Sequence, residues 1–268
     1  MREPDFDVSW PESWKFSYAY DREEVFGKPV HHGYAYAYSQ RQRIALQAVQ
    51  KVASPPATVL DVAAAQGNFS LLLAEGGYRV TWNDLRSDLV DYVRLKHETG
   101  TIDFVPGNVL EASFDSLFDV VLITEVIEHV AHPDQFLAKI ATLLKPNGHV
   151  VMTTPNGAYV LNRQPKFSEC PDPSQYEAVQ FRPNSDGHIF LLHDDEVRAL
   201  SEQAGLKLLD LRYYANVITS GHLKTSPLTR ALGRRNVEVI ESFTCRSPHW
   251  IQRKLHAGMA AIFQKCAS

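Results

Sequence analysis

Residues 58–84 read TVLDVAAAQGNFSLLLAEGGYRVTWND, and this stretch decides the fold of the chain. It begins with a short apolar run, residues 58–62, whose β-branched residues favour a buried strand. Small residues follow, then a helical pattern that two glycines end, then a second apolar run over residues 78–82. Asp84 comes directly after that run. A strand, a small-residue turn, a helix and a strand with an acid at its tip are half of a doubly wound nucleotide-binding fold.

The turn after the first strand suits a ligand that carries no phosphate. Small residues at 63–65 and at Gly67 let backbone N–H groups approach a ligand closely. A dinucleotide fingerprint needs three glycines to seat a pyrophosphate, so this turn argues against a nicotinamide-dependent oxidoreductase. It favours an adenosine that carries an amino acid. Asp84 is placed to accept hydrogen bonds from two ribose hydroxyls, and Asp61 to hold an ammonium group directly or through water.

Residues 61–68, DVAAAQGN, followed by WND at 82–84, resemble the first two motifs of the class I S-adenosylmethionine-dependent methyltransferases. The family commonly has glycine where this chain has Ala63 and Ala65, and a Cβ at Ala65 would narrow the approach to the methionine part of the ligand. The resemblance implies an α/β, doubly wound (Rossmann-like) fold. Its seven-stranded sheet would be mostly parallel with one antiparallel strand, and helices would cover both faces. It also implies S-adenosyl-L-methionine as the cofactor.

Other cofactor contacts are expected where further strands end. The predicted third strand, residues 102–105, leads into a turn in which Asn108 stands where relatives often carry an acid that reaches the adenine amino group. Its side-chain oxygen can accept the same hydrogen bond, although local backbone preference equally explains an asparagine after a glycine. The predicted cofactor-binding residues are Arg43, Asp61, Ala63, Ala65, Gly67, Asp84, Leu85, Asn108, Val109 and Thr124.

Length and composition set outer bounds on the protein. The 268 residues are enough for one large domain, and we predict a single domain over residues 1–268. A net charge of −4 argues against wrapping long nucleic acid by bulk electrostatics. Three widely separated cysteines predict reduced thiols in a cytoplasmic protein. Neither a signal pattern nor an apolar run of about 20 residues is found, so we expect no membrane partner.

Three segments are expected to surround the predicted sheet. Residues 1–52 are rich in aromatics and predict a lid over the cofactor and substrate, or equally a cover for the open edge of the sheet; a helical pattern begins at Tyr38. On that helix Gln40 and Arg43, one turn apart, are candidates to contact the methionine carboxylate. The proline-rich residues 155–187 predict an active-site loop. The basic residues 220–256 predict a C-terminal insertion, most simply a solvated surface helix.

The remaining apolar runs complete the sheet. The fourth strand is predicted at 118–124, the fifth at 149–154 and the sixth at 206–214, with helices at 87–97, 134–144 and 194–204. Residues 259–265 predict a seventh strand, antiparallel and beside the sixth.

A second motif, EVIEH at residues 125–129, follows the fourth strand. If these residues form a helical turn, two carboxylates and an imidazole share one face. With His188, the motif is similar to the ubiquinone-biosynthesis O-methyltransferases and to the small-RNA 3′-terminal 2′-O-methyltransferases. In the second group two glutamates and two histidines hold a magnesium ion. The resemblance implies the ligands Glu125, Glu128, His129 and His188.

The donor chemistry of this motif leaves its role open. Carboxylates suit Mg²⁺, whereas imidazole is preferred by Zn²⁺, Mn²⁺ or Fe²⁺. Other family members carry the motif without a metal, where its residues cap a helix or touch the surroundings of the cofactor. Without a metal, the candidate catalytic residues are His129 and His188, each able to act as a general base for a hydroxyl. His132 is a further candidate, equally explained as a solvated loop residue.

These observations support three hypotheses about function. The first is methyl transfer to a hydroxyl oxygen of a small molecule or glycan. The second is an RNA 3′-terminal 2′-O-methyltransferase, favoured by the four candidate ligands and the basic segment but opposed by the acidic net charge. The third is a non-catalytic cofactor-binding scaffold, which the alanines in the turn at 63–65 support.

Overall fold

The computed structural model describes residues 1–27, 34–180 and 187–266. Seven strands form one sheet in the order β3-β2-β1-β4-β5-β7-β6. The pairs among β1 to β5 are parallel, and β7 runs antiparallel to both of its neighbours, β5 and β6. The predicted doubly wound sheet with one antiparallel strand is therefore confirmed. The strands are β1 (Thr58–Val62), β2 (Arg79–Asn83), β3 (Thr101–Phe104), β4 (Phe118–Thr124), β5 (Leu144–Pro155), β6 (Leu206–Asn216) and β7 (His256–Lys265).

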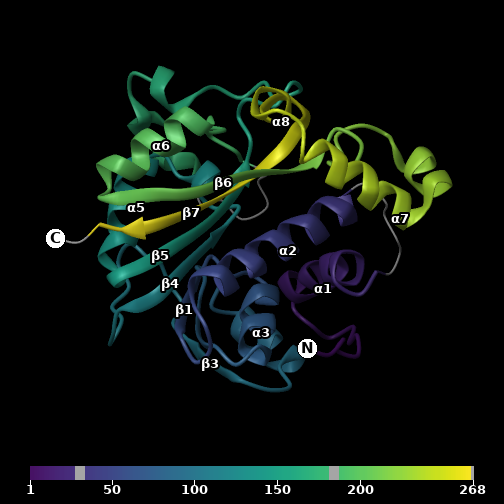
Figure 1. Ribbon diagram of the computed structural model, residues 1–268. Helices are drawn as coiled ribbons and strands as arrows, with labels where there is room; N and C mark the ends of the chain where they lie inside the picture. The colour runs from purple at the N-terminus through teal and green to yellow at the C-terminus, as the bar shows by residue number, and fades with distance from the viewer. Residues whose placement is uncertain (28–33, 181–186, 267–268) are drawn as a thin grey trace.

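Helices cover both faces of the sheet because its central strands are apolar on both sides. Leu60 and Val62 of β1 pack with α5 (Pro133–Thr142) and α6 (Asp194–Gln203). Val59, which precedes Leu60, packs with α2 (Tyr34–Val52) and α3 (Asn68–Glu75) on the opposite face. Figure 1 shows these two helical layers on either side of the strands. The alternation places every second side chain of a strand in the same layer.

Several elements begin earlier than the sequence predicts, two of them by four or five residues. The second helix begins at Tyr34, four residues before the predicted Tyr38. The fifth strand begins at Leu144, five residues before the predicted residue 149, and contains an irregularity where the pairing register with β4 shifts. Asn147 adopts a φ of 62° there, a left-handed conformation that asparagine tolerates better than most residues.

The N-terminal segment is attached to the helices near the β3 edge of the sheet. The Asp21 carboxylate of α1 (Glu12–Glu24) is fully buried and lies 2.6 Å from Lys96 Nζ at the end of α4 (Leu89–Lys96). It also accepts hydrogen bonds from the side chains of Asn68 and Tyr92 at 2.7 and 2.8 Å. Trp10 packs edge-on against Tyr92. The aromatic N-terminal residues thus extend the hydrophobic cluster that joins α4 to β2 and β3.

Two helices lie between β6 and β7, where the sequence predicts a basic insertion. They are α7 (Ser226–Thr244), which is kinked at Gly233, and α8 (His249–Leu255). Figure 1 shows α7 beyond the end of α2, at the side of the molecule. The predicted loop after β5 contains two short turns, η2 (Phe167–Glu169) and η3 (Pro173–Val179). Within the described ranges, no helix is both long enough and apolar enough to span a bilayer.

Candidate functional site

A cavity of about 560 Å³, partly open to solvent, lies where β1, β2 and β4 end. The chain reverses its winding direction between β1 and β4, and ligands of doubly wound folds bind in the crevice at such a point. Five of the ten predicted cofactor-binding residues line this cavity. These five are Ala63, Asp84, Leu85, Asn108 and Val109, and they are joined there by Glu125 and His129.

The turn that forms one wall is held in an unusual backbone conformation. Ala63 and Ala65 have φ angles of 52° and 48°, in the left-handed region that costs an L-residue about 1–2 kcal/mol. Gly67 has a φ of 71°, and a Cβ there would meet a methyl group of Val93 at 2.8 Å. Glycine is therefore required at Gly67 for both conformation and space. The two alanines hold the same turn at an energetic cost.

Ala65→Gly is expected to raise the free energy of unfolding by about 0.5–1 kcal/mol, because glycine adopts a positive φ without steric cost. The midpoint of urea unfolding measures the change. Ala64→Gly is the matched control, since Ala64 lies in the same turn but is not among the described residues with positive φ. That control should lower stability, and an equal gain in both variants would contradict strain at Ala65.

The Asp84 carboxylate joins this turn to the end of β2. One oxygen accepts the backbone N–H of Ala65 at 2.8 Å, and the other accepts the backbone N–H of Arg86 at 2.8 Å. The side chain is 5% exposed, so its orientation is set by these bonds. The oxygen that accepts the Arg86 backbone N–H also lies 3.2 Å from Arg86 Nε, whereas the oxygen bonded to Ala65 keeps a second lone pair for a ligand hydroxyl. Asn83 supports the neighbouring wall, because its amide donates to the carbonyl oxygens of Val105 and Gly107.

Asn108 lies in the cavity wall, as predicted, but its side chain is engaged locally. Its oxygen accepts the backbone N–H of Leu110 at 3.1 Å, and its amide donates to Glu111 at 3.2 Å. This is the arrangement that local turn preference predicts. The oxygen retains one lone pair for a ligand amino group.

Asp61 lies behind the turn and is fully buried. One of its oxygens accepts a 2.6 Å hydrogen bond from the Ser70 hydroxyl, and the other has no partner in the described structure. Burial raises the pKa of Asp61 to about 7. An unpaired buried carboxylate oxygen is stabilised by a cationic ligand group, so this residue fits the ammonium group of S-adenosylmethionine.

On the other side of the cavity, Glu125 departs from the predicted helical turn. Its φ of 56° is left-handed, and only residues 127–129 form a single 3-10 turn, η1 (Ile127–His129). The prediction that residues 125–129 share one helical face is therefore wrong. The Glu125 carboxylate instead accepts a 3.1 Å hydrogen bond from the Tyr214 hydroxyl and lies 3.3 Å from Arg41 Nη1.

The structure brings three of the four predicted metal ligands together. Donor atoms of Glu128, His129 and His188 all lie within 4.8 Å of one another, and the two imidazole rings are 4.9 Å apart. Glu128 is fully buried; one oxygen accepts from the Thr154 hydroxyl at 3.0 Å, and the other has no described partner. Burial, reinforced by the Glu125 carboxylate, raises the pKa of Glu128 well above its ordinary value. The unpaired oxygen and two imidazoles fit a divalent cation.

The tautomer of His129 follows from its partner. Its Nδ1 lies 3.2 Å from the carbonyl oxygen of Gly187, which can only accept a hydrogen bond. Nδ1 therefore carries the proton, and Nε2 keeps a lone pair for a metal ion or for a substrate proton.

The other predicted residues lie outside the cavity wall. Arg43 donates to the Gln40 side chain, and Thr124 ends β4 without lining the cavity. Ala65 and Gly67 form the turn behind the wall. His132 lies 2.8 Å from Glu177, consistent with the loop role that the sequence also allowed.

Sequence reasoning missed Arg41 and Tyr214, which hold Glu125. Tyr214 lies near the carboxyl end of β6, at the edge of the sheet where ligands bind, and that position was a usable signal. Nothing in the sequence distinguishes Arg41 from Arg43, two residues later on the same predicted helix, as the arginine that reaches the cavity.

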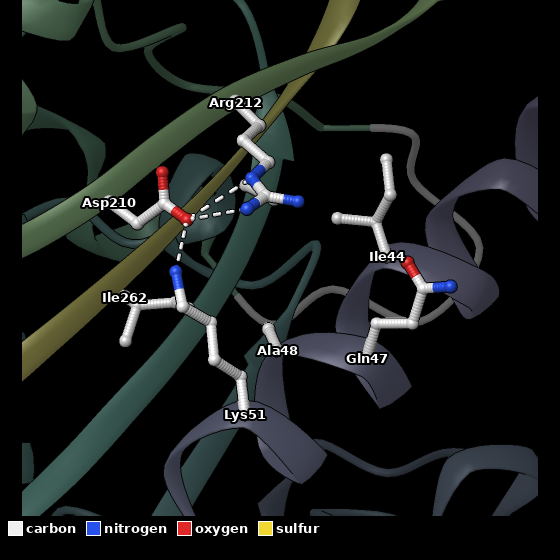
Figure 2. A pocket seen from close by; sticks show the side chains of 8 residues that line it. Ile44, Gln47, Ala48, Lys51, Asp210, Arg212 and Ile262 are labelled. Atoms are coloured by element: carbon white, nitrogen blue, oxygen red, sulfur yellow. Dashed lines mark hydrogen bonds and ion pairs between the residues drawn. The ribbon is translucent and has the colours of Figure 1, made fainter. Parts of the chain in front are cut away.

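A second hollow lies between α2 and the β6 edge of the sheet. Figure 2 shows the Asp210 carboxylate there, joined to the ammonium group of Lys51 and the guanidinium group of Arg212. The Lys51 and Arg212 nitrogens lie 2.8 and 3.0 Å from an Asp210 oxygen. Both cationic groups of this hollow pair with its one carboxylate, and it holds none of the predicted site residues.

Comparison with known proteins places the chain in a family. Residues 36–211 match the family described as a methyltransferase domain. The chain belongs to this family. The prediction of a class I S-adenosylmethionine-dependent methyltransferase is thereby confirmed.

Individual relatives of this methyltransferase agree with the family. This methyltransferase is 32% identical to a ubiquinone biosynthesis O-methyltransferase of Rickettsia conorii, over 52% of the chain and 54% of that protein. It is 31% identical to a protein of the same name from Xanthomonas campestris pv. campestris over 60% of the chain and 67% of that protein. The alignment thus spans about half the length of the Rickettsia relative.

Among solved structures, the fold is similar to that of the N-methyltransferase NodS from Bradyrhizobium japonicum, solved with S-adenosyl-L-homocysteine. The TM-score is 0.52 at 14% identity, covering 95% of this chain and 99% of that one. At this identity the likeness concerns the fold of the methyltransferase alone.

Proposed function

We propose that this methyltransferase transfers the methyl group of S-adenosylmethionine to a hydroxyl oxygen of a small molecule or glycan. The observation that carries the proposal is a single cavity with cofactor-type residues, Asp84 and Asn108, in one wall and Glu125 and His129 in the other. The likeness to relatives named ubiquinone biosynthesis O-methyltransferases supports oxygen as the methylated atom.

The cofactor-side residues would each hold one part of S-adenosylmethionine. Asp84 would accept hydrogen bonds from the ribose hydroxyls, and Asp61 would pair with the ammonium group. Leu85, which is 47% exposed beside Asp84, offers an apolar surface for the adenine ring. The bound cofactor supplies a methyl group already activated on a sulfonium. The protein therefore has to position the acceptor oxygen, exclude water and take up one proton.

The opposite wall supplies the proton acceptor. His129 has a lone pair on Nε2 and is itself in the cavity wall, so we assign it as the general base when no metal is bound. Glu128, His129 and His188 would hold a divalent cation, which would lower the proton cost of an alcohol. Glu125 is not assigned as a ligand, because Arg41 and Tyr214 already occupy its oxygens.

Two flanking segments would enclose the acceptor. Arg41 connects α2 of the 1–52 segment to Glu125 in the cavity wall. Gly187, at the end of the 155–187 loop, contacts His129 through its carbonyl oxygen. These contacts support the hypothesis of a lid over the cofactor and substrate for residues 1–52 and of an active-site loop for residues 155–187.

Glu128→Gln tests the metal-assisted form of the proposal. Production of S-adenosylhomocysteine is measured over a panel of phenols, sugars and short RNAs, with Mg²⁺ or Mn²⁺ and with a chelator. We expect the chelator and the substitution each to lower turnover about 100-fold or more, because both remove the charge that favours the alkoxide. Glu177→Gln is the matched control, since Glu177 is exposed and pairs with His132.

The same assay separates the alternatives. Loss of turnover with His129→Ala, combined with indifference to chelator and to Glu128→Gln, would assign a general base without metal. Methylation of RNA ends alone would favour the second hypothesis. Tight binding of S-adenosylhomocysteine without turnover on any acceptor would contradict the proposed function and favour the scaffold.

A further inference from the structure

A second group of potential metal ligands lies outside the cavity, between the insertion and the sheet. It consists of Glu241 and Cys245 near the end of α7 and of His256 at the start of β7. Glu241 is 2% exposed and His256 is fully buried. Donor atoms of the three side chains all lie within 4.8 Å of one another. We propose that this group binds a Zn²⁺ ion that fastens α7 to the end of the sheet.

The distances fit a tetrahedral ion. Cys245 Sγ lies 3.6 Å from His256 Nε2 and 3.8 Å from Glu241 Oε1. Tetrahedral zinc with a Zn–S bond of about 2.3 Å and a Zn–N bond of about 2.0 Å separates its sulfur and nitrogen ligands by about 3.5 Å. The side chains therefore need only small movements to reach coordinating positions. Three protein ligands leave the fourth position for a water molecule.

Neighbouring groups already orient two of the ligands. His256 Nδ1 lies 3.0 Å from the carbonyl oxygen of Gln252, so Nδ1 carries the proton. Nε2 lies 3.6 Å from the sulfur and 3.2 Å from the Thr244 hydroxyl, whose own proton is donated to the carbonyl oxygen of Glu241, so the lone pair of Nε2 stays available. Metal-bound histidines are commonly fixed in this way. The Glu241 carboxylate accepts the backbone N–H groups of Ala215 and Asn216 at 2.7 and 3.1 Å. These bonds hold the carboxylate in place and leave a lone pair of Oε1 toward Cys245.

The donor set selects the kind of ion. A thiolate, an imidazole and a carboxylate suit zinc and exclude magnesium, which prefers oxygen ligands alone. On binding, the Cys245 thiol loses its proton to solvent, and the thiolate and Glu241 together balance the charge of the ion. Cys170 and Cys266 belong to no comparable group in the described part of the chain, so they provide matched controls.

The position of the group gives the ion a structural role that reaches the cavity. Glu241 bonds to the N–H of Ala215, the residue after Tyr214, whose hydroxyl donates to Glu125. Asn156, which follows β5, donates its amide to the carbonyl oxygen of His256. An ion here would thus stiffen the ends of β6 and β7 beside the acceptor wall. This inference does not depend on the proposed reaction.

Cobalt substitution tests the site in the 268-residue chain. The metal-free protein is titrated with CoCl₂ and then with ZnCl₂, and the thiolate-to-cobalt charge-transfer band is recorded. The His188→Ala variant serves as the background, because it removes a ligand from the Glu128 group. We expect one equivalent of Co²⁺ to give the band, Zn²⁺ to abolish it, and Cys245→Ser to lose it. Cys170→Ser and Cys266→Ser should retain it.

Stability gives an independent readout. In the same His188→Ala background, one equivalent of ZnCl₂ should raise the melting temperature of the chain and of its Cys170→Ser variant by several degrees, and that of its Cys245→Ser variant by none. Cys245→Ser replaces the thiol with a hydroxyl of similar size. The circular dichroism spectrum of the variant checks that it folds. Absence of a charge-transfer band, or a band and zinc shift that survive Cys245→Ser, would overturn the proposal.

Discussion

Asp84→Ala is expected to lower the affinity for S-adenosylhomocysteine about 100-fold, as measured by isothermal titration calorimetry. A hydrogen bond to a charged carboxylate contributes about 1.5–3 kcal/mol, and a 100-fold loss corresponds to about 2.7 kcal/mol. The substitution also removes the acceptor that holds the N–H of Ala65. The loss therefore combines missing ribose bonds with a looser turn.

Asp84→Asn separates these two contributions. Asparagine keeps one acceptor oxygen for the turn but loses the charge and replaces the other acceptor with a donor. We expect it to bind more weakly than the parent chain and more tightly than Asp84→Ala. Asp91→Ala is the control, because Asp91 is an exposed acid on the following helix. Unchanged affinity in Asp84→Ala would contradict the assignment of the ribose site to this residue.

Lys96→Met is expected to lower the free energy of unfolding by about 3–5 kcal/mol, because it leaves the Asp21 carboxylate buried without its cation. Both side chains are 0% exposed, and their charged atoms are 2.6 Å apart. The substitution also removes the ammonium group that donates to the Asn68 oxygen at 2.7 Å. Urea unfolding followed by circular dichroism measures the change.

Lys51→Met is the matched control for the loss of a lysine. Lys51 makes an ion pair with Asp210 at 2.8 Å (Figure 2), but its side chain is 55% exposed. Solvent screens such pairs, so the expected change is about 0–1 kcal/mol. The double variant Asp21→Asn with Lys96→Met should recover part of the stability, because no unpaired charge then remains. Equal effects in the two single lysine variants would show that burial of the Asp21 pair has no special energetic role.

The buried pair of Asp21 and Lys96 also holds the N-terminal helix against the turn at residues 63–67. Asn68, which bonds to both Asp21 and Lys96, is the first residue of α3 and directly follows Gly67. The N-terminal helix is therefore fastened to the base of the turn. Neither Asp21 nor Lys96 shows this in the sequence, where each reads as an ordinary charged surface residue.

The amino-acid sequence was enough to place the strands and the residues at their ends that line one wall of the cavity. Continuous apolar runs predict buried parallel strands, and the residue that follows such a run lies at the ligand-binding edge. Asp84 and Asn108 could be placed in the cavity on that basis alone. The information is local: strand period, turn composition and the position of an acid after a strand lie within a few residues of one another.

The contacts around Glu125 and the group formed by Glu241, Cys245 and His256 could be found only in the folded chain. Glu125 is turned toward Arg41 and Tyr214, which are 84 residues before it and 89 residues after it in the chain. Cys245 and His256, only 11 residues apart, meet because α8 between them returns the chain to the sheet. The side chains that meet over such separations depend on strand order and on how helices pack across the layers. Periodicity in one segment carries no information about the side chains of another, so these contacts follow from packing alone.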